Sequence, residues 1–283
     1  MDHRKDIRDF LTSRRARITP ERAGLPNYGG KRRVAGLRRE EVALLAGVSV
    51  DYYIRLEQGK ERNPGAGVLT ALAAVLRLNE EELAYLHDLA RHASGAAPPA
   101  PEPTAAVPPG IRQLLERVRP CPAYVLSRTG DVMAANPEVL ELFTGMRRWP
   151  AGRRNTVRYT FCHPAARDLF PNWEDRAASA VANLRTVTAT DPEAPDLAAL
   201  VAELRAASSD FARLWERHDV QRRRGETKGF AHPRLGLVTL TLDVLYLEGG
   251  QRVGVYQARP GSADDRALKA LARLAAQETP AGG

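Results

Sequence analysis

The chain is poor in cysteine and contains no long apolar run. Its 283 residues include only two cysteines, Cys121 and Cys162, which are too few for a disulfide framework and fit a reducing compartment. Each thiol is either an inert buried group or a redox-active one. No apolar stretch is long enough to cross a bilayer, and the first ten residues lack the apolar core of a secretory signal. We therefore expect a cytoplasmic protein that has no membrane partner.

The chain also lacks the motifs of common catalytic and metal sites. Its six histidines form no HExxH motif, and an extended segment would point the neighbours Cys162 and His163 to opposite sides. The stretch Gly29-Gly30-Lys31 lacks the first glycine and the Ser or Thr of a phosphate-binding loop. Ser208-Ser209 is expected on a helix, without the strand and elbow of a hydrolase nucleophile. We expect no catalytic residue, no metal and no resident cofactor.

Basic residues gather at the N-terminal end of the chain. The net charge is +8, which favours a polyanionic partner. Residues 1–39 hold 12 Lys or Arg and only 4 acidic residues, so the excess in this stretch equals the net charge of the whole chain. A polyanion is therefore expected to bind near this end.

The stretch from Leu37 to Pro64 has the pattern of two short helices joined by a glycine turn. Val42, Leu45 and Ala46 form one apolar face of a helix over 39–46. Gly47 follows, and glycine adopts the left-handed backbone of such a turn without strain.

A second helix is expected over 49–58, with Ser49 as its N-cap and Gly59 at its end. Tyr53 and Leu56 supply its buried side, and its outward side chains are Val50, Asp51, Tyr52 and Arg55. Two helices at this spacing, with small Ala43 at their crossing, are typical of a helix-turn-helix. The alternative is an ordinary αα-hairpin in a helical bundle.

Residues 37–78 resemble an Xre/Cro-type, phage-repressor-like DNA-binding domain. The matching residues are Ala43, Gly47, Arg55-Leu56-Glu57-Gln58-Gly59, Pro64 and the later helix Val68-Leu69-Leu72-Ala73-Leu76. With helices at 4–17, 66–77 and 80–91, the resemblance implies a five-helix, lambda-repressor-like domain. It also implies an ion pair between Arg14 and Glu57, for which Arg15 is the alternative partner.

The resemblance makes helix 49–58 the recognition helix, which enters the major groove of double-stranded DNA. The expected DNA-binding residues are Arg38, Arg39, Val50, Asp51, Tyr52, Arg55, Lys60, Arg62, Lys31, Arg32 and Arg33. The last three lie in a stretch rich in glycine and proline between Thr19 and Gly36. This stretch either contacts phosphates, or reads a narrow minor groove, or is only a solvated basic loop.

A linker divides the chain into two domains. Between Ala93 and Gly110 the composition changes to Ala, Pro, Ser and Gly, with six prolines and too few apolar residues to fold. We predict a helix-turn-helix domain over 1–92, a linker over 93–109 and a second domain over 110–277.

The second domain has a mixed helix and strand pattern. The expected helices are 110–118, 137–143, 173–187, 196–217 and 263–276, and the expected strands are 123–126, 132–135, 238–246 and 252–258. In 238–246 every even position is apolar, which marks a half-buried antiparallel strand. Strand, turn, strand and helix in this order are typical of the start of a PAS-like domain. The fold class is therefore multidomain, an all-α domain followed by an α+β sensor domain.

The second domain is similar to the MmyB-like ligand-binding domain, which follows an Xre-type domain in actinobacterial regulators. The motifs are Tyr124-Val125-Leu126, Asp131-Val132, Ala135-Asn136, Phe211-xxx-Trp215-xx-His218-Asp219-Val220 and His232-Pro233-xx-Gly236. The resemblance covers roughly 108–275 and implies a PAS-like sensor for a small apolar, fatty-acid-like ligand.

The aromatic residues of this domain either fill a core or line a ligand cavity between sheet and helices. The expected ligand-binding residues are Tyr124, Phe143, Phe161, Phe170, Trp173, Phe211, Trp215, Leu240 and Leu242.

These observations favour a dimeric transcription regulator that binds a palindromic operator, with two recognition helices roughly 34 Å apart. In one rival interpretation, the C-terminal region is an enzyme beside an autoregulatory helix-turn-helix. In others it only dimerises the protein, or senses through a haem, flavin or redox group.

Overall fold

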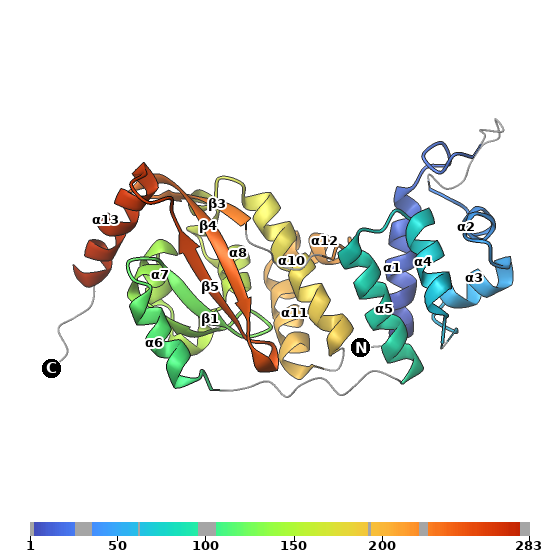
Figure 1. Cartoon of the computed structure of the whole chain (residues 1–283), viewed down its shortest axis with the longest axis horizontal. Helices are drawn as coiled ribbons and strands as arrows, with labels where there is room; N and C mark the ends of the chain where they lie inside the picture. The colour runs from blue at the N-terminus through green and yellow to red at the C-terminus, as the bar shows by residue number, and fades with distance from the viewer. Residues whose placement is uncertain are drawn as a thin grey trace. The chain divides into compact units, whose positions relative to one another are not determined.

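The computed structural model describes residues 3–25, 36–61, 63–95, 106–191, 194–220 and 226–277. Figure 1 shows the elements in chain order from blue to red. The chain forms two compact units, and neither is a single stretch of sequence. Unit 1 comprises Met1–Ala100, Arg185–Pro195 and Trp215–Arg222, and unit 2 comprises Pro101–Leu184, Asp196–Leu214 and Arg223–Gly283.

Helices at the expected positions build the N-terminal part of unit 1. They are α1 (His3–Arg17), α2 (Arg39–Ala46), α3 (Val50–Glu57), α4 (Ala66–Val75) and α5 (Glu80–Ser94). Apolar residues repeat at three and four positions along them, so each helix buries one face in a common core. Asn79 begins α5 as predicted, because its side chain accepts a hydrogen bond from the Glu82 amide at 2.9 Å.

Two short segments from beyond the linker complete unit 1. Val220, in the segment Trp215–Arg222, is 6% exposed and joins the same apolar core as Phe10 and Leu86. The Tyr85 hydroxyl lies 3.5 Å from the Thr188 hydroxyl, in the segment Arg185–Pro195. The compact units are not continuous stretches of chain, so they do not test the domain bounds expected from the sequence. Those bounds stay a prediction.

Helices surround a sheet in unit 2. The elements before the last helices are α6 (Pro109–Arg117), β1 (Ala123–Leu126), β2 (Val132–Ala135), α7 (Pro137–Leu142), the 3-10 turns η1 (Met146–Arg148) and η2 (Ala151–Arg153), α8 (Thr156–Cys162) and α9 (Ala166–Leu169). They are followed by α10 (Trp173–Thr190), α11 (Pro195–Ala207), α12 (Ser209–Trp215), β3 (Glu226–His232), β4 (Gly236–Tyr246), η3 (Glu248–Gly250), β5 (Arg252–Gln257) and α13 (Ala263–Gln277). Helices α10 and α12 each run from unit 2 into unit 1.

The strands that the structure describes form a five-stranded antiparallel sheet in the order β2-β1-β5-β4-β3 (Figure 1). In β4 the predicted alternation is confirmed from Val238 to Leu242, where apolar side chains are buried and the threonines between them are exposed. It ends before Tyr246, which is 59% exposed. This α+β architecture is the fold class expected for the second domain. Helix α13 packs on α7 and β4.

Several parts of unit 2 differ from the sequence prediction. Helices α8 and α9 were not predicted, and Cys162 ends α8 where an extended segment was expected. The single helix expected over 196–217 is wrong, because the chain breaks at Ser208 into α11 and α12. The Ser208 hydroxyl accepts a hydrogen bond from the Phe211 amide at 3.2 Å and so caps the second helix. Strand β3 was not predicted; it contains Gly229 and gains its hydrogen bonds only by pairing with β4.

Candidate functional site

The turn between α2 and α3 has the geometry that the sequence predicts. Gly47 adopts a left-handed backbone with φ of 68°, and its amide bonds back to the end of α2. The Ser49 hydroxyl accepts a hydrogen bond from the Tyr52 amide at 3.2 Å, so it caps α3. Val42, Ala43, Tyr53 and Leu56 lie in the core of unit 1. These two helices and their glycine turn are the elements of the helix-turn-helix that the sequence predicts.

The outer face of α3 is available for contact with DNA. Val50 is 36% exposed, and the Arg55 side chain is 56% exposed. The Arg55 guanidinium lies 5.9 Å from the centre of the Tyr52 ring, and its Nη2 atom lies 3.5 Å from Glu61 Oε2. Asp51, at the start of the helix, is also exposed. The face therefore carries an exposed guanidinium and a phenol, both groups that can hydrogen-bond base edges.

Tyr52 presents a neutral hydroxyl on this face. Burial, and then the nearby Glu61 carboxylate, raise its pKa, although Arg55 opposes the shift. A neutral phenol both donates and accepts hydrogen bonds, which suits a residue that contacts bases or phosphates.

Glu57, at the end of α3, ties three helices of unit 1 together. The Arg15 Nε and Nη2 atoms donate to its two carboxylate oxygens at 2.9 and 3.1 Å, and the Arg39 Nε atom donates at 2.9 Å. Burial acts to raise the pKa of Glu57, but the hydrogen bonds from Arg15 and Arg39 outweigh it and lower the pKa. The pairing of Glu57 with Arg14 is wrong, and the alternative partner Arg15 is confirmed. Arg14 and Arg15 leave α1 in different directions, because successive residues are turned by about 100° around a helix axis.

The remaining predicted DNA contacts lie around this centre. Arg38 begins α2, where its amide donates to Glu41 Oε2 at 2.7 Å and its side chain is exposed. The Arg39 side chain is 44% exposed although it also binds Glu57, and Lys60 is exposed. Lys31, Arg32, Arg33 and Arg62 lie outside the described residues, so their roles stay predictions. The predicted DNA-binding residues that the structure describes all lie on α2, on α3 or directly beside them.

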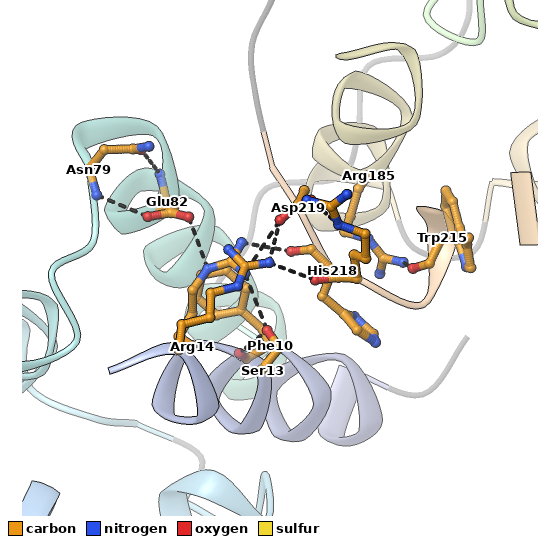
Figure 2. Close-up of polar contacts among 11 residues, drawn as sticks. Phe10, Ser13, Arg14, Asn79, Glu82, Arg185, Trp215, His218 and Asp219 are labelled. Atoms are coloured by element: carbon orange, nitrogen blue, oxygen red, sulfur yellow. Dashed lines mark hydrogen bonds and ion pairs between the residues drawn. The ribbon is translucent and has the colours of Figure 1, made fainter. Parts of the chain in front are cut away.

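Arg14 instead binds the segment that unit 1 gains from the C-terminal half of the chain (Figure 2). Its Nε atom lies 2.9 Å from Glu82 Oε1, and its Nη2 atom donates to the His218 carbonyl at 2.7 Å. Asp219 lies 3.9 Å from its Nη1 atom and also pairs with Arg17. The Arg14 guanidinium stacks over the Phe10 ring at 4.6 Å. Burial lowers the pKa of Arg14 to about 10, so it stays charged at neutral pH.

Arg185 also holds this segment in place. Arg185 donates to the Trp215 carbonyl, and its guanidinium lies 4.3 Å from the centre of the Trp215 ring (Figure 2). Burial, and then Arg185, lower the pKa of His218 to about 4, so its imidazole is neutral at neutral pH. The sequence motif that contains Trp215, His218 and Asp219 was read only as a family resemblance, and its attachment to α1 was missed.

The predicted ligand-binding residues of unit 2 fall into two aromatic groups. Phe143 lies at the centre of the first group, where its ring packs against Tyr124, Phe170, Tyr159, Phe230 and Tyr256 with centroid distances of 5.4–6.5 Å. Phe161 forms the second group by packing edge-on against Trp173 at 5.9 Å and Phe211 at 5.1 Å. Leu240 and Leu242 are buried on β4, and Trp215 belongs to unit 1. Most of these side chains are buried against one another.

A cavity of about 220 Å³ lies beside the first group. It is lined by Phe170, Pro171, Asn172, Asp175, Arg176, Ser179, Thr227, Lys228 and Gly229. Of the predicted ligand-binding residues only Phe170 lines this cavity, so the remaining assignments stay predictions. Arg176 was missed, because one arginine on a helix carries no sequence signal of burial.

Among the described residues no group of three or more His, Cys, Asp or Glu side chains could hold a metal ion. Nor does any helix in the described ranges have the length and apolar character needed to cross a membrane.

Comparison with known proteins agrees with both halves of the chain. A family model described as a helix-turn-helix domain matches residues 11–86. The model of the MmyB-like transcription regulator ligand binding domain matches residues 107–271, which is more than half of the chain. No curated protein matches the chain. Both resemblances inferred from the sequence are confirmed. The chain therefore belongs to the family of the MmyB-like transcription regulator ligand binding domain, and it joins this domain to a helix-turn-helix domain, as expected of a DNA-binding transcription regulator.

Proposed function

We propose that the protein is a sequence-specific transcription regulator whose DNA binding responds to a small apolar, fatty-acid-like ligand of its C-terminal domain. The observation that carries this proposal is the composition of unit 1. Residues Arg185–Pro195 and Trp215–Arg222 come from within the stretch matched by the ligand-binding model, yet they belong to the compact unit of the helix-turn-helix. The ion pairs of Asp219 with Arg14 and Arg17 attach the second segment to α1, and the contact of Thr188 with Tyr85 attaches the first to α5.

These shared segments give a route for a ligand to affect DNA binding. Helices α10 and α12 have their first residues in unit 2 and their last residues in unit 1. A ligand that favours one arrangement of these helices in unit 2 therefore changes the free energy of the segments that pack on α1. A ligand shifts the equilibrium between two states only by its difference in affinity for them.

The active form is a homodimer on a palindromic operator. Helix α3 enters the major groove, and the positive residues around α2 contact phosphates. Two recognition helices must then lie roughly 34 Å apart, so a small change at the dimer interface is enough to alter operator affinity. The protein works in the cytoplasm, on the nucleoid, and catalyses no reaction.

Redox sensing by the C-terminal domain is not favoured. Burial raises the pKa of both Cys121 and Cys162, so both are protonated thiols at neutral pH. The thiolate is the reactive form of cysteine, and redox-sensing cysteines have lowered pKa values.

Selection of DNA from a random-sequence pool by the purified full-length protein tests the proposal. We expect an enriched inverted repeat whose half-sites are one helical turn apart, and an affinity that changes when C6–C18 carboxylic acids are added. If an inverted repeat is enriched but its affinity does not change with any acid, the C-terminal domain serves only in dimerisation. The absence of any enriched sequence would contradict sequence-specific binding.

A further inference from the structure

The cavity in unit 2 is small and is lined by polar groups at the start of α10. Its walls come from the segment before α10, from the first turns of α10 and from the first half of β3. Its volume of about 220 Å³ corresponds to roughly seven water-sized groups of about 30 Å³ each. This is at or below the lower end of the range for ligand pockets, so it suits a small ligand.

Arg176 is the most unusual side chain in these walls. It is only 9% exposed, and its guanidinium stacks on the Phe170 ring at 3.8 Å and lies 5.3 Å from the Phe143 ring centre. Its Nε atom is buried without a hydrogen-bond partner. No carboxylate among the described residues forms an ion pair with Arg176 within 4.0 Å. The other buried arginines each donate to an acceptor: Arg14 to the His218 carbonyl, Arg185 to the Trp215 carbonyl and Arg252 to the Arg128 carbonyl.

A buried cation without a counter-charge is costly, because desolvation is not offset by a partner. The two aromatic rings offset part of this cost through cation–π attraction and hold the guanidinium plane in place. The rings cannot accept hydrogen bonds from the coplanar N–H groups of the guanidinium, whose geometry matches the two oxygens of a carboxylate. An anion in the cavity would supply the missing acceptor.

The other charges around the cavity decide what kind of anion fits. Lys228 adds a second positive charge from β3, and Asp175 adds a negative charge from α10. Together with Arg176 the formal charge of the walls is +1, which suits a singly charged anion. The positive end of the α10 dipole lies at the same place and adds to the attraction. Phe170 and Pro171 offer an apolar surface beside the charged groups.

We propose that this cavity binds a short monocarboxylate of about eight non-hydrogen atoms or fewer, with its carboxylate on Arg176. The aliphatic part of the ligand packs against Phe170 and Pro171. This inference rests on the proposed ligand-sensing function, and it names the chemical class and the length of the ligand. The part of a long-chain acid that exceeds the volume of the cavity would lie outside it.

Isothermal titration calorimetry of the full-length protein tests this assignment. The probes are butanoate, hexanoate and dodecanoate, with hexan-1-ol as the uncharged match of hexanoate and inorganic phosphate as another anion. We expect hexanoate to bind at least about tenfold more tightly than hexan-1-ol, dodecanoate and phosphate. Arg176→Met, which keeps the volume, should weaken hexanoate binding at least about tenfold, and Arg176→Lys should give an intermediate affinity because it keeps only the charge.

Arg167→Met is the matched control. Arg167 also stacks on an aromatic ring, Trp173, at 3.8 Å, but it is paired with Asp210 and does not line the cavity. Its substitution should leave hexanoate affinity unchanged. Melting temperatures of all variants without ligand show whether the protein still folds, and Arg176→Lys serves as the informative variant if Arg176→Met does not.

Several outcomes would overturn the assignment. Equal hexanoate affinity in the wild type and Arg176→Met would show that Arg176 does not bind the ligand. Equal affinities of the wild type for hexan-1-ol and hexanoate would show the same. Tighter binding of phosphate than of hexanoate would assign the cavity to an inorganic anion. No binding of any short acid, together with a large loss of melting temperature in Arg176→Met, would make Arg176 a structural residue only.

The same titrations separate this inference from the proposed function. If hexanoate binds through Arg176 but operator affinity does not change, the ligand site stands and the proposed response of DNA binding fails. If operator affinity responds to uncharged or long-chain compounds in both the wild type and Arg176→Met, the sensing function stands and the short-carboxylate site fails.

Discussion

At the scale of single residues, unit 1 contains two groups of ion pairs, one around Arg15 and one around the adjacent Arg14 on α1. Arg15 faces the recognition helix through Glu57, and Arg14 faces the C-terminal segment through His218 and Asp219. Helix α1 therefore carries the anchors of both α3, the proposed recognition helix, and the segment proposed to transmit the ligand signal. Residue substitutions can test the two sets separately.

Glu57→Gln should destabilise unit 1 by about 2–3 kcal/mol, because hydrogen bonds between charged groups are replaced by weaker ones and two arginines lose their counter-charge. Urea denaturation followed by circular dichroism gives this value. Glu61→Gln is the control, since its pair with Arg55 is long and solvated and should change stability by less than about 1 kcal/mol. An equal effect of both substitutions would contradict the anchoring role of Glu57.

The stability of unit 1 should also depend on His218 below neutral pH. The folded pKa of His218 is about 4, whereas the unfolded value is about 6.5. The unfolded state therefore binds more protons between these values, so this stability is fully present above about pH 6.5 and is lost as pH falls toward 4. His218→Asn, which tolerates the φ of 54° at this position, should show a smaller fall in melting temperature from pH 7 to pH 5. An unchanged fall would show that other groups control this range.

Arg55→Ala should lower affinity for the selected operator by about 1–3 kcal/mol and leave affinity for random DNA nearly unchanged. Fluorescence anisotropy with both DNAs makes the comparison. Arg91→Ala serves as the control, because Arg91 is an exposed arginine on α5 with one acidic neighbour, Asp88. An equal loss on both DNAs would mean that Arg55 contacts only phosphate.

At the scale of elements, the helices and strands with a strong apolar period could be predicted from the sequence. The helix-turn-helix, β1, β2, β4 and α13 all lie close to their expected bounds. The helices of the helix-turn-helix, β4 and α13 each bury one regular face, so their local pattern contains the information that fixes them. Strands β1 and β2 instead have uniform burial along their length. Ser49 and Asn79 could also be named as caps, because capping depends on residues three positions apart.

The sequence could not reveal the features that depend on contacts between distant residues. Strand β3 has no apolar alternation of its own, and the attachment of His218 to Arg14 joins positions 204 residues apart. The choice between Arg14 and Arg15 depends on the rotation of α1 in its core. The aromatic residues of unit 2 suggested a cavity, yet most of them pack on one another, and the described cavity is beside them at Arg176.

The segment around Asp219 is the element whose role is most directly testable. Asp219→Ala removes pairs with Arg14, Arg17 and Arg217, so it should weaken the effect of ligand on operator affinity while α3 stays intact. Asp210→Ala is a matched control, because Asp210 also lies between two arginines but within unit 2. Anisotropy titrations with and without hexanoate give the ratio of affinities for each variant. A wild-type ratio in Asp219→Ala would contradict the proposed route.

At the scale of the whole molecule, the chain combines two units that share helices α10 and α12 in sequence. A regulator built in this way does not need a large movement, because coupling between sites is a difference of free energies and not a distance. Typical couplings of 1–3 kcal/mol change affinity by about 5-fold to 150-fold. The account therefore predicts a measurable effect of ligand on DNA binding in the full-length protein.

The most direct test of this account is the operator affinity of the full-length protein measured by anisotropy with and without saturating hexanoate, whose binding calorimetry has established. The account predicts a change of at least about fivefold, in either direction, and a much smaller change in Arg176→Met. Equal operator affinities with and without bound hexanoate would contradict the claim that a ligand in unit 2 controls DNA binding by unit 1.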